Sequence, residues 1–339
     1  MAVLGLTKAR SMGPVADAVE RAGGSLARVF RTADLPLRLI EQPERFILLR
    51  DQLRLVACAA REVGDPALAA RLSMEAGVPG LGALGQSVLA ADRLDAAISR
   101  TNGMMGRMLQ SSTRLELIAE DGMAHWTYRV TDASEVGRQL NEILALGYML
   151  DLLRRFLGPG FTPLRAAVTG APVTGRPAVE QVLGVELSRH ATALLSFPAE
   201  HLCTPNRRRL PGPGAPERDM PPAPIADDLV ALARHLIALQ LLERRPCLTT
   251  LARRLGLSPR TLQRRLGTRG TTFEALLRTV MEEEAEVLLR HGHLSVAAVA
   301  LELGFADAAH FSRAFRSWKG MPPRNWRRTA LAQQHRPDP

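Results

Sequence analysis

Residues 248–267 read LTTLARRLGLSPRTLQRRLG. Within this stretch Ala252 lies four positions before Gly256, and Leu262 follows Gly256 by six positions. A small side chain lets two short helices cross closely, and glycine favours the left-handed backbone of a tight turn. Ser258 suits the N-cap of the second helix. The pattern predicts a helix-turn-helix unit over residues 248–267.

The same arrangement returns 48 residues later in the run LSVAAVALELGFADAAHFSRAFRSWKG. Ala300 and Gly304 repeat the spacing of the first unit, but the turn is one residue longer, so Phe311 becomes the core anchor. Phe315 adds to a cluster of aromatic residues, a class that makes up only 4% of the chain. The run predicts a second helix-turn-helix unit over about residues 295–318, with a small aromatic core.

A continuous amphipathic pattern over residues 272–290 predicts a helix between the two units, about 27 Å long at 1.5 Å per residue. Major-groove faces of B-DNA recur about every 34 Å, so such a connector can place two reading helices in successive grooves. Its stretch MEEEAEVLL contains four glutamates, which would repel phosphate, and we expect them to point away from DNA. The expected buried face consists of Val280, Ala285, Val287 and Leu288.

The run GFADAAHFSRAFRSWKGMPPRNWRR (residues 304–328) extends the pattern and closes with the motif Gly320, Pro323, Trp326 and Arg327. Together with the tandem units, this run resembles the DNA-binding domain of the AraC/XylS family of transcription regulators. More weakly, residues 1–205 resemble the N-terminal effector domain of the subgroup typified by ornithine-utilisation regulators. That likeness rests on GLGALGQSVLAADRLDAAI (residues 80–98) and LLSFPAEHL (residues 194–202).

The resemblance implies two reading helices and two kinds of DNA contact. The base-reading residues it implies are Arg260, Gln263 and Arg264 in the first unit and Ala309, Ser312 and Arg313 in the second. Arginine can bind guanine and glutamine can bind adenine through two hydrogen bonds, and alanine can touch a thymine methyl group. Contacts to the sugar-phosphate backbone are expected from Ser258, Thr261, Arg265, His310 and Arg316. These position the protein without reading sequence.

Charge and composition divide the chain in two. Residues 246–328 contain 14 Lys or Arg and 7 Asp or Glu, so +7 of the formal net charge of +10 lies there. A basic part joined to a nearly neutral part is typical of a protein in which only one domain meets phosphates. Seven prolines between Cys203 and Asp227 indicate a stiff linker. The expected divisions are an effector-binding and dimerisation domain at 1–203, a linker at 204–226, a DNA-binding domain at 227–330 and a tail at 331–339.

The expected fold is an α+β N-terminal domain followed by an all-α domain. Helical spacing covers residues 15–29, 46–63, 66–74, 84–109 with breaks allowed, 133–157 and, after the linker, 227–242. Alternating residues on both sides of Glu120-Asp121-Gly122 predict one β-hairpin. Two short apolar runs, 164–168 and 191–197, are expected to add strands to its sheet.

Several other readings carry less support from the residues. His201 with Cys203, His291 with His293, and the acids Glu282 to Glu284 lack a complete set of metal ligands, so neither a metal nor a cofactor is expected. Cys247 faintly resembles the nucleophile of DNA-repair methyltransferases fused to this kind of domain, but Leu248 and Thr249 replace the His-Arg pair of that motif. A non-enzyme is therefore expected.

The remaining expectations concern partners and location. The sequence shows neither a signal peptide nor an apolar run long enough for a membrane span, so a cytoplasmic protein without membrane contact is expected. Some 200 residues of mixed core exceed what dimerisation needs, which favours a small-molecule effector over a purely architectural DNA-binding protein. Its pocket residues stay unassigned, and amino-acid-like effectors follow by analogy alone. Double-stranded DNA, RNA polymerase and a second protomer complete the expected partners, with activation as the expected outcome.

Overall fold

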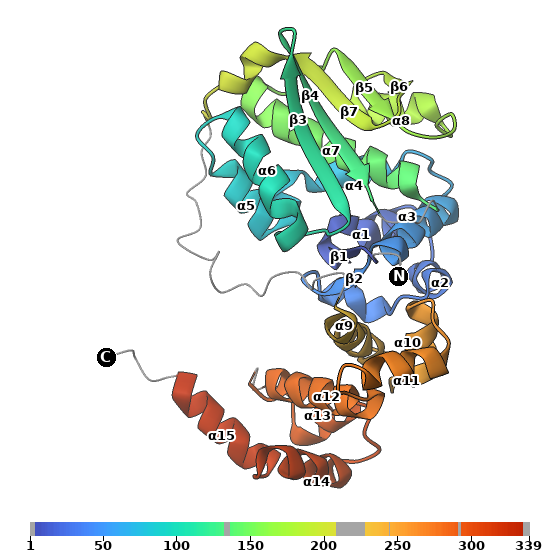
Figure 1. Cartoon of the computed structure of the whole chain (residues 1–339), viewed down its shortest axis with the longest axis vertical. Coiled ribbons are helices and arrows are strands. Elements are labelled where there is room, and N and C mark those ends of the chain that lie inside the picture. The colour runs from blue at the N-terminus through green and yellow to red at the C-terminus, as the bar shows by residue number, and fades with distance from the viewer. Residues whose placement is uncertain (1–3, 132–135, 208–227, 244, 291–292, 335–339) are drawn as a thin grey trace. The chain divides into compact units, whose positions relative to one another are not determined.

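The structure is a computed structural model that describes residues 4–131, 136–207, 228–243, 245–290 and 293–334. The chain forms two compact units, Met1–Asp227 and Asp228–Pro339 (Figure 1). The first contains helices and sheets, and the described residues of the second form helices only. The predicted fold class, an α+β domain followed by an all-α helix-turn-helix domain, is confirmed.

A mixed five-stranded sheet organises the N-terminal unit. Its order is β3 (Thr113–Glu120), β4 (Met123–Val130), β7 (Ala193–Pro198), β5 (Arg165–Val168) and β6 (Leu187–Arg189). Neighbouring strands are antiparallel except β5 and β6, which are parallel. Along β4 the residues Ala124, Trp126, Tyr128 and Val130 are buried, while those between them are half-buried or exposed. This alternation is typical of a strand with one face on the core.

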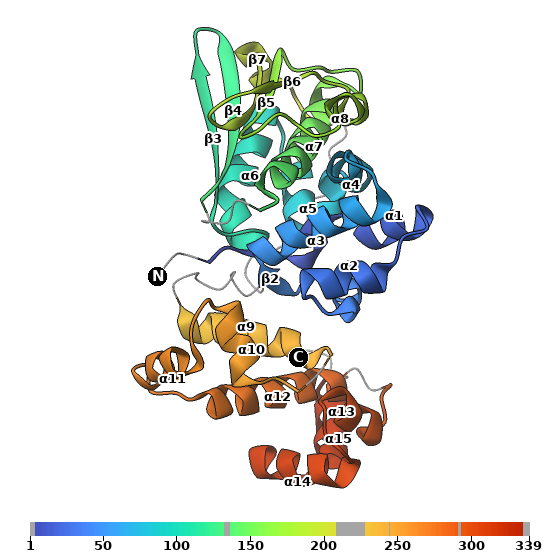
Figure 2. The ribbon, with the colours of Figure 1, turned by 90° about the vertical axis from the view of Figure 1, so that its right-hand side faces the viewer.

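Helices cover the buried face of this sheet (Figures 1 and 2). The long helix α7 (Arg138–Leu157) packs against β4, β5 and β7, and α6 (Leu94–Met108) packs against β3. The N-terminal unit also contains α1 (Val15–Arg21), α2 (Leu26–Ala33), α3 (Leu49–Val63), α4 (Leu68–Ala76), α5 (Ala83–Leu89), α8 (Arg176–Leu183), and short 3-10 helices that include η1 (Ala9–Met12) and η3 (Val78–Leu81). A small sheet pairs β1 (Leu6–Lys8) with β2 (Phe46–Leu48).

The predicted hairpin and both additional strands are confirmed. Asp121 and Gly122 have φ angles of 49° and 76°, which suits a two-residue hairpin turn. The helix predicted over 15–29 divides into α1 and α2, because Gly23 takes a φ of 73° between them. The start of the helix predicted at 46–63 is instead strand β2. Its pairing partner β1 lies about 40 residues earlier, so local periodicity could not reveal it.

The C-terminal unit contains α9 (Leu229–Leu241), α10 (Leu248–Arg254), α11 (Pro259–Gly267), α12 (Phe273–Arg290), α13 (Val296–Glu302), α14 (Ala308–Lys319) and α15 (Pro323–Gln334). Its tandem units are α10 with α11 and α13 with α14, joined by α12. Helix α15 continues past residue 330, where the DNA-binding domain was expected to end.

Little of the expected linker lies within the described residues. Its positions 208–226 lie outside them. Its first positions are bonded to the N-terminal unit: the Asn206 amide donates to the Asp92 carbonyl at 2.8 Å, and the Leu94 amide donates to the Thr204 carbonyl at 3.0 Å. Residues 204–206 therefore belong structurally to the unit that precedes them.

Candidate DNA-binding surface and ligand cavity

The first helix-turn-helix forms through local backbone geometry. Gly256 has a φ of 66°, and the Leu257 amide donates to the Ala252 carbonyl at 2.9 Å, which closes the end of α10. Ala252 and Leu262 are fully buried where α10 meets α11. Ser258 caps α11 by accepting a hydrogen bond from the Thr261 amide at 3.2 Å.

The second unit repeats these contacts with different side chains. Gly304 has a φ of 74°, and the Phe305 amide donates to the Ala300 carbonyl at 2.9 Å. Asp307 caps α14 by accepting from the His310 amide at 2.6 Å. The hydrogen bond lowers the pKa of this carboxyl below its ordinary value, so a negative charge stands at the start of α14. The two units thus share a backbone design but differ in N-cap charge.

An aromatic core supports α14, as the sequence predicts. Phe311 and Phe315 are fully buried with ring centroids 5.7 Å apart, and Trp326 of α15 packs edge-on against Phe315 at 5.9 Å. Arg290, at the end of α12, places its guanidinium 5.3 Å from the centre of the Trp326 ring. Helix α15 therefore completes the hydrophobic core beneath α14.

The predicted base-reading side chains occupy the outer faces of α11 and α14. Arg260, Gln263 and Arg264 of α11 are exposed, and so are Ala309 and Arg313 of α14. Ser312 is half-buried, and its hydroxyl donates to the Ala308 carbonyl at 2.7 Å. Buried residues on the opposite side of each helix fix its orientation.

The predicted backbone-contacting residues gather near the N-terminal ends of the same helices, except Arg265 and Arg316, which lie further along. The Thr261 hydroxyl hydrogen-bonds the Ser258 hydroxyl at 2.8 Å. The His310 ring lies edge-on to Phe305, with centroids 5.3 Å apart. Arg316 is exposed, and Arg265 is half-buried. Amides at a helix start favour bound anions, so Ser258 and Thr261, at the uncharged start of α11, have a suitable setting for phosphate.

The glutamates of α12 are held by cations of the same unit. Lys319 of α14 forms an ion pair with Glu282, with Nζ and Oε1 2.6 Å apart, and a second pair with Glu286. Arg234 of α9 pairs with Glu283. Because these carboxylates have intramolecular cationic partners, an acidic α12 is compatible with a DNA-binding domain.

One part of the predicted α12 face is wrong. Val287 was expected to be buried, but 46% of it is exposed, and Leu289 is fully buried instead. Leu288 is half-buried, whereas Val280 and Ala285 are buried as expected. Residue 287 lies two positions after Ala285, about 200° around the helix, and so faces the opposite side.

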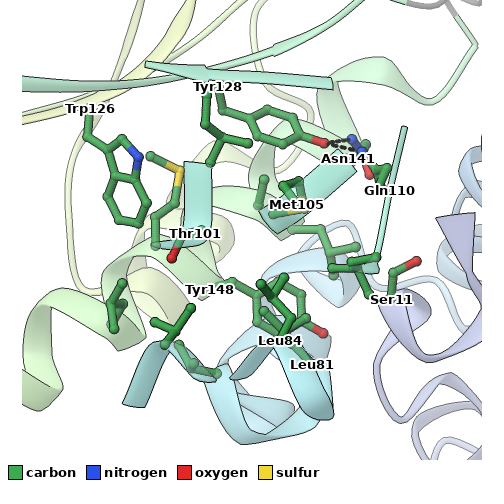
Figure 3. Close-up of a pocket in the computed structure, with 18 of the residues that line it drawn as sticks. Ser11, Leu81, Leu84, Thr101, Met105, Gln110, Trp126, Tyr128, Asn141 and Tyr148 are labelled. Carbon is green, nitrogen blue, oxygen red and sulfur yellow. Dashed lines mark hydrogen bonds between the residues drawn. The ribbon is translucent and has the colours of Figure 1, made fainter. Parts of the chain in front are cut away.

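A cavity opens inside the N-terminal unit, between the sheet and the helices that cover it (Figure 3). Its volume is about 60 Å³. The sheet contributes Leu115, Trp126 and Tyr128 to the wall, and most other lining residues come from α5, α6 and α7. Sequence reasoning did not assign these residues, because they come together from distant segments.

Most polar side chains in the cavity wall are bonded within the protein. The Tyr128 hydroxyl accepts from Gln110 at 2.8 Å and from Asn141 at 2.6 Å, as the dashed lines in Figure 3 show. The Trp126 indole donates to Asn102 at 3.0 Å, and the Thr101 hydroxyl donates to the Ala97 carbonyl at 2.9 Å.

The structure also describes most of the cysteine, histidine and glutamate groups considered as metal or catalytic sites in the sequence. Cys58, Cys203 and Cys247, all within the described residues, form no disulfide, and the Cys247 thiol hydrogen-bonds the Thr250 hydroxyl at 3.2 Å. Within the described residues, no three His, Cys, Asp or Glu side chains are grouped so as to hold a metal ion. His291 lies outside the described residues.

No helix among the described residues is both long and apolar enough to cross a membrane.

Comparison with known proteins identifies both units. Residues 251–329 match a family model described as a helix-turn-helix domain. Residues 23–206 match a model described as the arabinose-binding domain of AraC transcription regulators, N-terminal, which covers more than half of the chain.

Relatives align over nearly the whole length. The chain is 28% identical over 320 residues to the ornithine utilization regulator of Pseudomonas aeruginosa, covering 92% of this chain and 93% of that one. It is 24% identical over 336 residues to the regulator VirS of Mycobacterium tuberculosis, covering 95% and 96%. The crystal structure of the regulator CdpR from Pseudomonas aeruginosa aligns with a TM-score of 0.36 and 21% identity, over 78% of this chain and 87% of that one.

These matches support the interpretation of the chain as a transcription regulator. They do not support the alternative of a DNA-repair methyltransferase fused to this kind of domain. The chain belongs to the AraC family of transcription regulators, with the family's helix-turn-helix DNA-binding domain at its C-terminal end.

Proposed function

We propose that α11 and α14 are the reading helices and that Arg260, Gln263, Arg264, Ala309, Ser312 and Arg313 contact base edges. The observation that carries this proposal is the exposure of three long polar side chains along one side of α11, Arg260, Gln263 and Arg264, backed by a buried leucine core. Long side chains with paired donors suit guanine and adenine in the major groove. Ser258, Thr261, Arg265, His310 and Arg316 contact the sugar-phosphate backbone in this proposal.

The two reading helices contribute unequally in this proposal. Helix α11 begins at the neutral cap Ser258, whereas α14 begins at the ionised Asp307. A negative charge next to the groove opposes phosphate, and α14 offers the small Ala309 and Ser312 where α11 offers Arg260 and Gln263. Most direct base reading is therefore assigned to α11. Helix α14 positions the protein along the DNA and offers its small side chains for apolar contact with the bases.

Helix α12 sets the distance between the two readers. Its 18 residues give a length of about 27 Å at 1.5 Å per residue. Successive major-groove faces lie about 34 Å apart, so one chain can engage two of them. The ion pairs of Lys319 and Arg234 with the α12 glutamates keep their negative charge compensated.

The N-terminal unit supplies the signal in this proposal. An effector binds there and changes how the unit pairs with a second protomer or acts on its own DNA-binding domain, with a coupling free energy of about 1–3 kcal/mol. Two protomers then occupy paired half-sites and recruit RNA polymerase, which gives activation. The cavity favours this over a DNA-binding protein that senses nothing, and location in the cytoplasm follows from the function.

The test is a set of three arginine substitutions in the full-length protein. The wild-type binding site is first selected from random DNA, and affinities are then measured by fluorescence anisotropy on that site and on its single-base variants. Arg264→Ala and Arg313→Ala are each expected to cost about 1–3 kcal/mol and to relax preference at one base position.

Arg316→Ala serves as the matched control, because it also removes one exposed arginine from α14. It is expected to weaken binding to all sequences alike and to lower the dependence of affinity on salt. An equal loss on every sequence for all three variants would remove the assignment of Arg264 and Arg313 as base readers.

A further inference from the structure

Two buried polar side chains in the cavity wall have no hydrogen-bond partner among the described residues. They are the amide of Gln52, from α3, and the hydroxyl of Tyr148, from α7. Gln52 is 1% exposed and Tyr148 is 9% exposed. A buried polar group without a partner costs about 1–3 kcal/mol, so such groups are rare unless they serve a purpose.

These two groups stand apart from the rest of the wall. Every other polar residue of the cavity has a partner within the protein, including Ser11, whose hydroxyl bonds Thr7 at 2.8 Å. Figure 3 shows Tyr148 beside the apolar side chains of Leu81 and Leu84. Within the described residues, Gln52 and Tyr148 are therefore the wall residues whose polar side-chain atoms are buried with no partner at all.

The cavity wall contains no charged residue. The nearby charges are already engaged: Asp151 accepts from the Val78 amide at 2.6 Å and from Arg155 at 2.7 Å, and Arg10 pairs with Glu44 and donates to the Gly80 carbonyl at 3.2 Å. Burial raises the pKa of Tyr148, so its hydroxyl stays neutral. A charged ligand would lose its hydration here without a counter-charge, which costs several kcal/mol.

We propose that this cavity binds an uncharged, mainly hydrocarbon effector through one hydroxyl or carboxamide group, held by Gln52 and Tyr148. This rests on the proposed function, in which the N-terminal unit binds a small molecule. The amide of Gln52 both donates and accepts, and so does the Tyr148 hydroxyl. A hydroxyl or carboxamide satisfies both kinds of demand, whereas a carboxylate only accepts and leaves the Gln52 carbonyl unpaired.

The cavity is narrow, with space for a few water molecules at about 60 Å³. A ligand with more than a few heavy atoms therefore displaces side chains on entry. Met105 and Met149 line the wall, and their unbranched, flexible side chains are suited to such movement. An effector built like ornithine, the amino acid in the name of the 28% identical relative, carries charges that this wall does not match.

The experiment compares probes that differ in charge. Hexanamide, 1-hexanol, hexanoate and L-ornithine are titrated into the full-length protein at pH 7, with binding followed by calorimetry and by the thermal transition of the N-terminal unit. Hexanamide and 1-hexanol are expected to bind and raise the transition temperature. Hexanoate, which has the same chain, is expected to bind at least tenfold more weakly, and L-ornithine is expected not to bind.

Two substitutions test the residues. Gln52→Leu and Tyr148→Phe are each expected to weaken the binding of hexanamide at least tenfold. The stability of the ligand-free protein should stay equal or rise, because an unpartnered polar group is removed. Gln139→Leu is the matched control. The Gln139 amide donates to the carbonyls of Thr169 and Ala171 at 2.8 and 2.6 Å, so its loss lowers stability and leaves hexanamide binding unchanged.

Tighter binding of hexanoate or L-ornithine, or no binding of either neutral probe, overturns the proposal. The proposal is also overturned if Gln52→Leu and Tyr148→Phe both bind hexanamide as tightly as the wild type does. The assay contains no DNA, and the selected-site assay described above contains no ligand. A chain that ignores the neutral probes but still reads DNA through Arg264 and Arg313 would refute the ligand class and leave the DNA-reading proposal standing.

Discussion

Ser258 and Asp307 occupy the same position in the two helix-turn-helix units, yet their chemistry differs. Each side chain accepts the amide hydrogen of the residue three positions later, Thr261 in one case and His310 in the other. The hydroxyl does this without charge, whereas the carboxylate brings a negative charge to the helix start and interacts favourably with its dipole. A single residue thus contributes to the stability of each helix and sets the charge at its start.

Asp307→Ala is expected to lower the thermal transition of the C-terminal unit, and Asp307→Asn to lower it less, because asparagine also caps helices. The His310 amide lowers the pKa of Asp307 in the folded state, so this group stabilises the fold above the pKa it has when unfolded. That contribution is lost as the pH falls through the lower folded pKa.

The measurement is calorimetry of the wild type and both variants from pH 7 down to pH 3. The difference between wild type and Asp307→Asn should shrink over the acidic part of this range. A difference that stays constant with pH would contradict the role of the ionised carboxylate.

At the scale of elements, α12 is both connector and electrostatic partner. It carries the glutamates that bind Lys319 of α14 and Arg234 of α9, so ion pairs connect it to both helices, and it also packs against α9. The side chains of Lys319, Glu282 and Glu286 are 26%, 28% and 19% exposed. Their partial burial makes this pairing stronger than a fully solvated one.

Lys319→Gln is expected to lower the free energy of unfolding of the C-terminal unit by about 0.5–1 kcal/mol. It should also weaken DNA binding, because two carboxylates lose their cation. Hydrogen bonds from Lys319 to Glu282 and Glu286 raise its pKa, so the contribution is present at neutral pH and is lost only as the pH rises through the raised value.

Urea unfolding at pH 7 followed by helix content measures this change. Arg316→Gln is the matched control, since it removes one exposed positive charge from the same helix. Arg316→Gln should leave the unfolding free energy nearly unchanged. An equal loss in both variants would show that the stability effect reflects net charge and not the ion pairs.

At the scale of the whole molecule, the chain divides into two units with separate cores. Phe315 is fully buried in the aromatic core of the C-terminal unit. In the N-terminal unit, Gly147 of α7 passes so close to α4 that an added Cβ would lie 1.9 Å from the Ser73 hydroxyl oxygen. Each core therefore has a position at which a single substitution is expected to lower the stability of that unit strongly.

Phe315→Ala is expected to destabilise the C-terminal unit by about 3–5 kcal/mol, through lost burial and the cavity that remains. Differential scanning calorimetry of the full chain should show one transition shifted and the transition of the N-terminal unit unchanged. A shift of both transitions together would mean that the two units unfold as one cooperative body.

Gly147→Ala is expected to act on the other unit, lowering its stability by about 1–3 kcal/mol through overpacking against Ser73. Gly103→Ala in α6 is the matched control, because an added Cβ there meets nothing within 4 Å. That control should be neutral or stabilise by about 0.5–1 kcal/mol, since alanine favours a helix interior. Calorimetry of both variants distinguishes packing from any general effect of replacing glycine.

The DNA-binding half could be predicted in detail because its determinants are local. Gly256 and Gly304 define turns, Ser258 and Asp307 define helix starts, and each acts on neighbours within a few residues. The prediction failed at Val287, where the choice between adjacent faces of α12 depends on which helices pack against it. Helical periodicity predicts that α12 has an apolar face, and tertiary packing decides which apolar residues at the edge of that face are buried.

The sequence by itself determined the family, the tandem helix-turn-helix pair and the side chains on its outer faces. The order of strands, the β1–β2 pair and the cavity were decided only by the tertiary structure. Gln52 and Tyr148 lie 96 positions apart on α3 and α7, so no spacing links them. Turns and caps depend on short-range sterics and hydrogen bonds, whereas a cavity exists only where distant side chains pack around a space they do not fill.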